Sequence, residues 1–499
     1  MTRFLRLLLL GLALPTGAAA QGIDTLALRG HTYFLSHDLL EGRGTGTRGE
    51  RLAAHYIVSQ LMRLGLQPVG PNGSYELPVP LRAARIDNDS TRLTVGTGAN
   101  AVAFRSGRDF VVNTGGAAAL HDFAGEALFV GTAAQARRAL AATGSLQGKV
   151  IVTLGSLGGE ARTLVPDWIA RGAAGVVHLV PDPTSFALYA RSRGDTRYFV
   201  NAAVDDPVWQ PALPMAIAGP DVGRALLAGA QLPDSVLDGK APARALPLGH
   251  RLDVHVRATT SDVPSSNVAG LIPGRDPARR DEVVVYTAHY DHLGISTPDP
   301  RGDSIYNGFS DNAAGSAMLL AIADALRREP PARSVLFLFF TGEERGLLGS
   351  TYYATAPAVP LARTVAVVNL DAGAPPAPPT EWRFAGGESS SLGAAAQKLA
   401  ASHGWTATLG GASPNSDYWP FLQRGVPSIF IIPGAAWEGV SGAQQEALRR
   451  RWDHYHEAGD EWAADFPFAG LERYAQIALE LGRTVADAPA RPALLRSAP

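Results

Sequence analysis

The chain has 499 residues, of which 46% are hydrophobic and 18% are charged, and its formal net charge at pH 7 is −2. This length exceeds one ordinary domain, and the hydrophobic content suffices for sizeable cores, so the composition excludes a largely disordered chain. Basic residues do not cluster, which argues against nucleic acid as a partner, and without cysteine the chain forms no disulfide and must hold any metal through His, Asp and Glu.

The first 20 residues have the pattern of a signal peptide. Two arginines accompany a short apolar run at 4–14, and three alanines at 18–20 form a small-residue cleavage site before Gln21. The apolar run is shorter than the ~20 residues that span a bilayer. We therefore expect a secreted or periplasmic protein with no membrane anchor after cleavage.

Residues 24–64 carry the apolar periodicity of two helices, separated by the glycine-rich segment EGRGTGTRG at 41–49. Glycine-rich loops can cradle phosphate, but no strand and no Lys-Thr pair accompany this one. We interpret it as a turn between helices. Extended segments rich in turn residues follow over 75–117, so that 21–117 precedes any catalytic motif.

Near residue 118 the sequence pattern changes to short strand-like runs separated by helical stretches, which predicts a smaller α/β unit that ends near 243. EALFVG, KVIVTLG and LPMAIAG have the composition of strands there, with helical stretches between them. The unit contains few groups suited to catalysis. We interpret 118–243 as a lid or a binding module.

Residues 244–487 predict an α/β domain with a mixed, mostly parallel sheet flanked by helices. The run at 250–256 alternates as an antiparallel strand does, whereas VVVYTAH, SVLFLFF, TVAVVNL and PSIFIIP are typical of strands buried on both faces. Helical stretches separate these runs. The Pro- and Ala-rich residues 488–499 predict a flexible tail.

Groups suited to metal binding and acid–base chemistry stand at the ends of these runs. His289 ends VVVYTAH, and Asp291 is close enough to accept the second imidazole N–H. Asp311 precedes a helix, while Glu343 and Glu344 follow SVLFLFF and a Thr-Gly turn. Taken singly, each has an ordinary alternative: a capped surface histidine, a helix N-cap, or a solvated carboxylate pair. Together they are expected at one sheet edge, where the loops of an open parallel sheet gather ligands.

Two later segments offer further ligands. Asp371 closes the buried run TVAVVNL, where an acid is unusual, although a turn or cap residue is an alternative. The segment WDHYHEAGDEW contains both His454 and His456. We choose His456 because Asp460 lies four residues away.

The ordered motifs H-x-D, S-D-N-x-x-G, G-E-E, N-L-D and Y-H-x-x-x-D resemble the co-catalytic zinc metallopeptidase family M28, which includes secreted bacterial leucyl aminopeptidases and glutamate carboxypeptidase II. The resemblance covers about 21–117 and 244–487, including LSHDLLEGRGTGTRG, VPSSNVAGLIPG and SDYWPFLQRGVPSIFI. Residues 118–243 resemble a protease-associated domain, a common insertion in this family, through LQGKVIVTLG and LPMAIAG. The resemblance implies the zinc-exopeptidase, phosphorylase/hydrolase-like fold with this smaller α/β domain inserted.

The resemblance further implies two Zn²⁺ ions as cofactors and five metal ligands: His289, Asp311, Glu344, Asp371 and His456. Asp311 would bridge the ions. His289 and Asp371 would complete one position, and Glu344 and His456 the other.

Two further acids are implied to serve catalysis. Glu343 would be the general base that takes a proton from a metal-activated water, and Asp291 would orient His289. His292 and His454 remain as expected non-ligands.

The function implied is a zinc-dependent exopeptidase that acts on peptides at their N-terminus. Alternatives are a carboxypeptidase or dipeptidase of the same family, a glutaminyl cyclase, or a non-catalytic receptor-like protein. A full set of five ligands argues against the cyclase, which generally uses one zinc, and Glu343 argues against the receptor. Tyr418 stands where the family often has His; it could donate to an oxyanion or simply pack.

Overall fold

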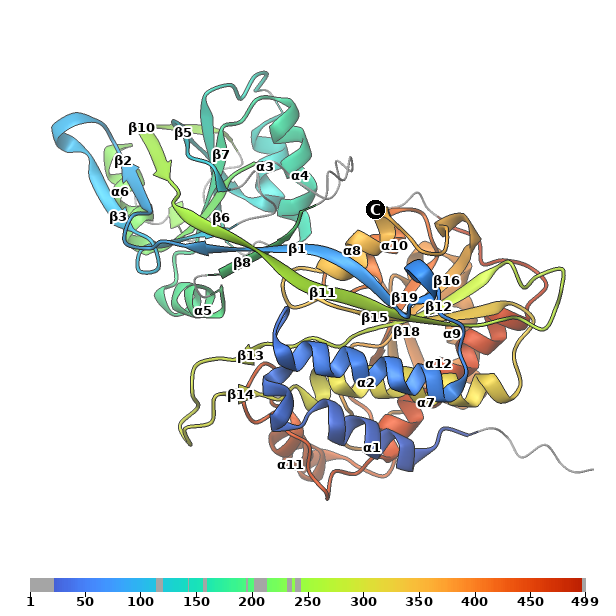
Figure 1. Cartoon of the computed structure of the whole chain (residues 1–499). Helices are drawn as coiled ribbons and strands as arrows, with labels where there is room; N and C mark the ends of the chain where they lie inside the picture. The colour runs from blue at the N-terminus through green and yellow to red at the C-terminus, as the bar shows by residue number, and fades with distance from the viewer. Residues whose placement is uncertain are drawn as a thin grey trace, which may run out of the picture.

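The computed structural model describes residues 22–113, 120–141, 143–155, 159–193, 196–201, 213–230, 236–237 and 244–495. These residues form a larger and a smaller lobe (Figure 1). The expected signal peptide lies outside the described residues. No helix within those ranges has both the length and the apolar character needed to cross a bilayer.

The larger lobe is built on a mixed sheet. Within the described residues nine strands form it, in the order β18 (Thr406–Gly410), β17 (Glu381–Ala385), β19 (Ser428–Pro433), β16 (Thr364–Asn369), β12 (Val283–His289), β15 (Ser334–Phe340), β11 (Ala258–Ile272), β1 (Glu76–Ile86) and β8 (Thr196–Val200). The central strands β19, β16, β12 and β15 run parallel, whereas β11, β1 and β8 are antiparallel. The expected α/β fold with a mixed sheet is confirmed, with its parallel part at the centre.

Helices cover both faces of this sheet (Figure 1). One face carries α1 (Thr25–Leu35), α2 (Arg48–Leu64), α7 (Ala314–Arg328) and α12 (Ala469–Asp487); the other carries α8 (Leu348–Thr355) and α10 (Trp419–Gln423). The remaining helices of this lobe are α9 (Ser391–Ser402) and α11 (Gly442–Trp452). Alternate residues of β12 enter opposite cores, Val284 and Tyr286 on the α7 side and Val283 and Val285 on the other. Burial on both faces explains why the strand is mostly apolar.

The smaller lobe has its own sheet and core. Eight described strands form that sheet, in the order β3 (Val102–Arg105), β2 (Arg92–Val95), β10 (Leu246–His255), β5 (Phe123–Thr132), β6 (Lys149–Leu154), β7 (Gly175–Leu179), β9 (Met215–Ala218) and β4 (Phe110–Asn113). The helices α3 (Ala133–Ala139), α4 (Gly159–Ala170), α5 (Pro183–Arg193) and α6 (Pro220–Gly229) belong to the same lobe. The sheet extends beyond the expected limits of 118 and 243, because β2, β3, β4 and β10 pair into it and share its apolar core.

The two lobes are joined by a ribbon of two long strands. β1 and β11 pair from Glu76↔Val268 to Ile86↔Ala258 and run from the larger sheet toward the smaller lobe (Figure 1). β8 then pairs with the same stretch of β1, from Leu81↔Val200 to Arg85↔Thr196. The connection between the lobes is therefore hydrogen-bonded sheet rather than a single linker.

Part of the expected flexible tail is held in place. The amide of Ser391 donates to the carbonyl of Ala493 at 2.8 Å, and that of Leu495 donates to Ser389 at 2.9 Å. Arg491 also donates to Glu282 at 2.7 Å. Up to residue 495 the tail therefore packs at the start of α9, an interaction that a Pro- and Ala-rich composition does not reveal.

Candidate active site

The candidate site lies where the parallel strands of the larger sheet end. His289 is the last residue of β12, Glu343 and Glu344 follow β15, and Asp371 follows β16. Asp311 lies in the short helical segment Phe309–Ala313 that leads into α7. Because β12, β15 and β16 run in the same direction, their ends bring these side chains to one edge, as expected.

A first group of ligand atoms surrounds the imidazole of His289. Its Nε2 lies 2.8 Å from Asp371 Oδ1 and 3.1 Å from Asp311 Oδ1. Nδ1 donates to the main-chain carbonyl of Asp291 at 3.0 Å, which turns Nε2 toward the two carboxylates. These three residues offer one ligand atom each within 4.8 Å of one another.

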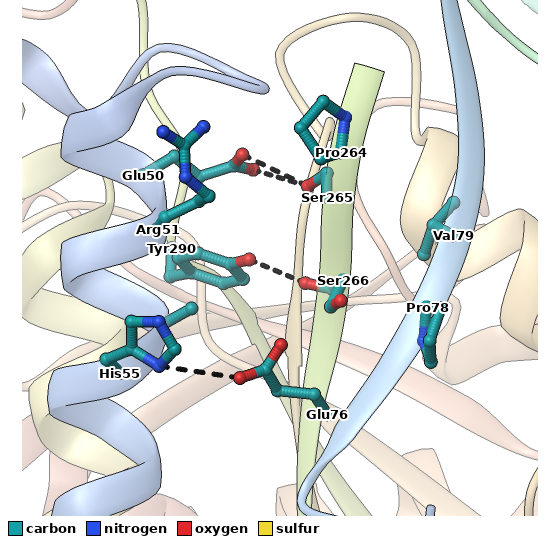
Figure 2. A pocket seen from close by; sticks show the side chains of 11 residues that line it. Glu50, Arg51, His55, Glu76, Pro78, Val79, Pro264, Ser265, Ser266 and Tyr290 are labelled. Carbon is teal, nitrogen blue, oxygen red and sulfur yellow. Dashed lines mark hydrogen bonds and ion pairs between the residues drawn. The ribbon is translucent and has the colours of Figure 1, made fainter. Parts of the chain in front are cut away.

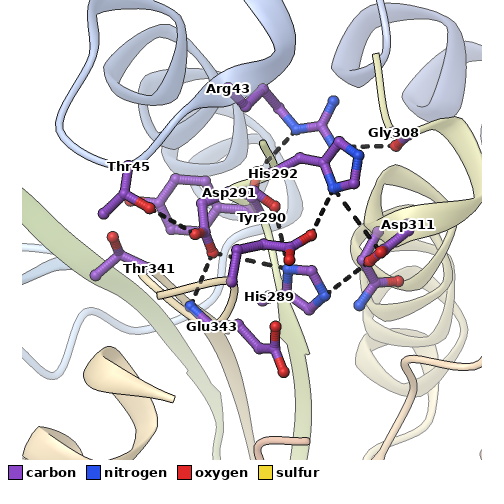
Figure 3. Close-up of polar contacts among 12 residues, drawn as sticks. Arg43, Thr45, His289, Tyr290, Asp291, His292, Gly308, Asp311, Thr341 and Glu343 are labelled. Atoms are coloured by element: carbon purple, nitrogen blue, oxygen red, sulfur yellow. Dashed lines mark hydrogen bonds and ion pairs between the residues drawn. The ribbon is translucent and has the colours of Figure 1, made fainter. Parts of the chain in front are cut away.

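A second group forms around Glu344 and the other oxygen of Asp311. His456 Nε2 lies 3.0 Å from Asp311 Oδ2 and 3.3 Å from Glu344 Oε2. His292 Nδ1 lies 2.6 Å from Glu344 Oε1 and 3.8 Å from Asp311 Oδ2 (Figure 3). Two imidazoles therefore reach this position, although the sequence left His292 outside it. His454 lies apart, with Nε2 3.1 Å from the carbonyl of Arg451.

Asp291 holds the site together in a way that differs from the expectation. Its carboxylate is 3.7 Å from His289 Nδ1, beyond hydrogen-bond distance, so the main-chain carbonyl takes the orienting role. The carboxylate instead accepts the hydroxyl of Thr45 at 2.8 Å and the amide of Glu343 at 3.2 Å (Figure 3). Asp291 thus positions both the metal-facing histidine and the expected general base.

Asp460 fixes the segment that carries Asp311. Its carboxylate accepts the amides of Ser310 at 2.9 Å and Asp311 at 3.1 Å. The proximity of Asp460 to His456 in sequence suggested a partner for that imidazole. The structure shows that Asp460 instead ties the late loop to the residue shared by both groups.

The pKa values of the adjacent glutamates are shifted in opposite directions. Burial raises the pKa of Glu343 well above its usual range; the charge of His289 opposes this shift, and those of Asp371 and Glu344 add to it. Burial and the charge of Asp311 also act to raise the pKa of Glu344, but His292 and His456 outweigh them and lower it to about 2. Neighbouring carboxyls with pKa values moved apart are typical of a base beside a ligand.

The donor set fits a divalent cation with nitrogen and oxygen ligands. Asp311, Glu344 and Asp371 place carboxylates against imidazoles at a largely buried edge, where uncompensated negative charge is costly. The guanidinium of buried Arg43 is close enough to Asp311 and Glu344 to affect them electrostatically. It does not neutralise them directly, because it donates to four main-chain carbonyls, those of Leu35, Tyr290, Asn307 and Gly308. Imidazole and carboxylate ligands of this kind suit zinc.

Two tyrosines near the site have different positions. Tyr418 is fully buried, and its hydroxyl accepts the amide of Ser413 and donates to the carbonyl of the same residue. These contacts support the packing interpretation of Tyr418. Tyr455, which the sequence reasoning missed, is 66% exposed, and its ring stacks on His456 at 3.9 Å. Its position directly before His456, a candidate ligand, could have identified Tyr455 from the sequence.

Sequence comparison relates the larger lobe to a family of peptidases. Residues 267–482 match the sequence model of Peptidase family M28. Aminopeptidase YwaD of Bacillus subtilis is 26% identical over 204 residues, which are 39% of this chain and 41% of the relative. A probable zinc metalloprotease of Pyrenophora tritici-repentis is 33% identical over 105 residues, 20% of this chain and 21% of the relative. The chain thus matches less than half the length of these curated relatives.

A solved structure extends the likeness to nearly the whole chain. An aminopeptidase from Aneurinibacillus sp. strain AM-1 superposes with a TM-score of 0.54 at 18% sequence identity. The match covers 96% of this chain and 97% of that protein. The two proteins therefore share a fold that includes both lobes.

Proposed function

With residues 267–482 matching Peptidase family M28, we propose that the protein is a zinc-dependent aminopeptidase that removes residues from the N-terminus of peptides. One observation carries the proposal: His289, Asp311, Asp371 and Glu344 converge at one sheet edge beside a carboxyl with a raised pKa, that of Glu343. The names of the aminopeptidase relatives support the choice of substrate end.

Two zinc ions would be held by the two groups of ligands. His289 and Asp371 face one position, Glu344 and His456 face the other, and the two oxygens of Asp311 face one each. Zinc bound there would acidify a water molecule and polarise the scissile carbonyl.

Glu343 is the proton carrier in this proposal. Its raised pKa makes it a stronger base than an ordinary carboxylate, so it accepts the proton of the attacking water. The same carboxyl then returns the proton to the leaving amine. Asp291 holds the main chain of Glu343 through its amide and so fixes where the base stands.

The two histidines at the second position are expected to respond differently to alanine. His456→Ala should release about one metal per chain, because it removes a ligand. His292→Ala should keep both metals with affinity lowered about 10–100-fold, the usual effect of losing a residue that orients a ligand, here Glu344. Metal content by elemental analysis, followed across a chelator titration, checks this. If His292→Ala releases a full equivalent and His456→Ala releases none, the two roles are exchanged.

The function itself is tested by metal content and a substrate panel measured together. Free aminoacyl-p-nitroanilides and short peptides are expected to be cleaved by the zinc-loaded protein, and their N-acetylated forms should not be. Added chelator should abolish the cleavage and zinc should restore it. Hydrolysis of the blocked peptides alone would overturn the aminopeptidase assignment and favour an enzyme that acts at the other end.

A further inference from the structure

A pocket of about 300 Å³ lies between α2 and the β1–β11 ribbon, next to the segment that follows β12 (Figure 2). Tyr290, between His289 and Asp291 in sequence, lines it. Glu50 also lines it and is 0% exposed. The proposed mechanism gives this buried carboxyl no role, and Glu50 lies outside the segment that matches the family.

Glu50 forms a closed triangle with two hydroxyls. Its Oε1 is in hydrogen-bond contact with Thr341 Oγ1, and both of its oxygens lie 3.0 Å from Ser265 Oγ. Ser265 Oγ and Thr341 Oγ1 are themselves 2.6 Å apart. The amide of Gly46 donates to Oε2 at 2.6 Å, so that oxygen is an acceptor.

The number of hydrogens available to these contacts favours a neutral Glu50. Four oxygen–oxygen contacts join the three groups, and the two between Ser265 and the carboxyl of Glu50 can share one hydrogen. Three hydrogens are therefore needed, and the two hydroxyls supply only two. A protonated Glu50 supplies the third: its Oε1 donates to Thr341, Thr341 donates to Ser265, and Ser265 donates to Oε2. An ionised Glu50 would leave one short contact between oxygens without a hydrogen.

Two sets of contacts from the N-terminal segment reach the loop that follows β15 and carries Glu343: the triangle through Thr341, and Thr45 through Asp291. Thr341 lies at the end of β15, two residues before Glu343. Thr45 donates to Asp291, which in turn accepts the amide of Glu343. Thr45 and Glu50 thus both restrain the main chain near Glu343, the expected general base.

We propose that Glu50, in its neutral form, is a positioning residue that fixes the loop carrying Glu343 through the hydrogen-bonded triangle with Ser265 and Thr341. This role rests on the proposed peptidase function. Through this role the N-terminal segment 45–50 would influence catalysis indirectly, by positioning Glu343.

The surroundings favour the neutral form. Burial raises the pKa of Glu50 to about 8, the nearby charge of Asp291 adds to the shift, and hydrogen bonds from Thr341, Gly46 and Ser265 oppose it. The other ionisable groups around the pocket are Arg51 and His55 on α2, Glu76 on β1, and Tyr290. His55 and Glu76 face each other at 3.4 Å and are partly or largely exposed, so their charges are screened by water.

The pH dependence of kcat tests the role. Glu50→Gln keeps a donor toward Thr341 and an acceptor toward Ser265, so kcat at pH 7 should stay within about threefold of wild type. Thr341→Val opens the triangle and should lower kcat about tenfold or more at every pH, with KM little changed. Above pH 8 the wild-type kcat should fall as Glu50 ionises, and the Glu50→Gln profile should lack that step. Glu76→Gln, in the same pocket but outside the triangle, is the matched control and should follow wild type.

Thermal melting provides a readout that needs no substrate. A carboxyl with a raised folded-state pKa contributes stability that is complete below its unfolded value and lost as pH rises through the folded value. For Glu50 that window runs from 4.5 to about 8. The Tm of Glu50→Gln relative to wild type should therefore rise steadily across this window and then level off.

The outcomes separate the two proposals. Two results would overturn the role of Glu50. One is a Tm that changes with pH in the same way in wild type and Glu50→Gln; the other is a kcat of Glu50→Gln at pH 7 as low as that of Thr341→Val. If the wild-type protein cleaves no peptide, the proposed function fails, while the melting curves still decide whether Glu50 is neutral in the fold.

Discussion

Glu343→Gln is expected to lower kcat by about 10²–10⁴-fold, the usual contribution of a general acid–base group, with KM and metal content close to wild type. The amide preserves the shape of the side chain but cannot accept the proton of the attacking water. Burial raises the pKa of Glu343, which equips it for that proton, and it stands outside both groups of ligand atoms. Steady-state kinetics and elemental analysis on the same preparation check the result.

Glu344→Gln is the matched comparison, because it makes the same chemical change one residue away. Glu344 contacts both His292 and His456, so this variant should lose metal along with activity. A Glu343→Gln variant that retains full activity, or one that loses metal as Glu344→Gln does, would defeat the separation of a base from a ligand.

Asp311→Ala is expected to remove both metals and with them all measurable peptidase activity. Asp311 is the residue common to the two groups, with Oδ1 3.1 Å from His289 and Oδ2 3.0 Å from His456. Its pKa lies well below the usual range: burial opposes ionisation, but hydrogen bonds from His289 and His456 outweigh it. The ionised carboxylate is thus present for metal binding across the neutral range.

Metal content per chain and activity after zinc addition measure this effect. Asp281→Asn is a suitable control, because that side chain is 87% exposed and pairs with Arg363 at the surface. Retention of two metals by Asp311→Ala would show that the two groups do not share a ligand.

The positions of the strand ends were predictable from sequence, and with them most of the site. A parallel strand buried on both faces is mostly apolar, so an ionisable residue at its end stands out, as do His289 at the end of β12 and Asp371 just after β16. Because parallel strands end at the same edge, such residues are neighbours in space even when the chain between them is long.

The site of His292 was not predictable in this way. Whether the imidazole three residues after His289 faces the metal position depends on how the chain turns beyond the strand, and Arg43 fixes that turn through the carbonyl of Tyr290. The contacts of Glu50 were equally hidden, since it lies 215 residues from Ser265 and 291 from Thr341 along the chain.

The limits of the smaller lobe were hidden for a different reason. Extended segments such as β2 and β4 have the same alternation whichever sheet they join, so the sequence between 92 and 113 does not reveal its partner strands. The pairing of β2 with β10 and of β4 with β9 places both strands in the sheet of the smaller lobe.

The pairing of β8 with β1 has a consequence for any attempt to shorten this protein. From Leu81 to Arg85, β1 has β11 on one side and β8 on the other. A version that lacks residues 118–243 would lose β8 and leave this stretch of β1 as an open edge, with free amides and carbonyls that can pair with the same edge of another molecule. β8, the last strand of the larger sheet, thus shields this stretch of β1 from pairing with another molecule.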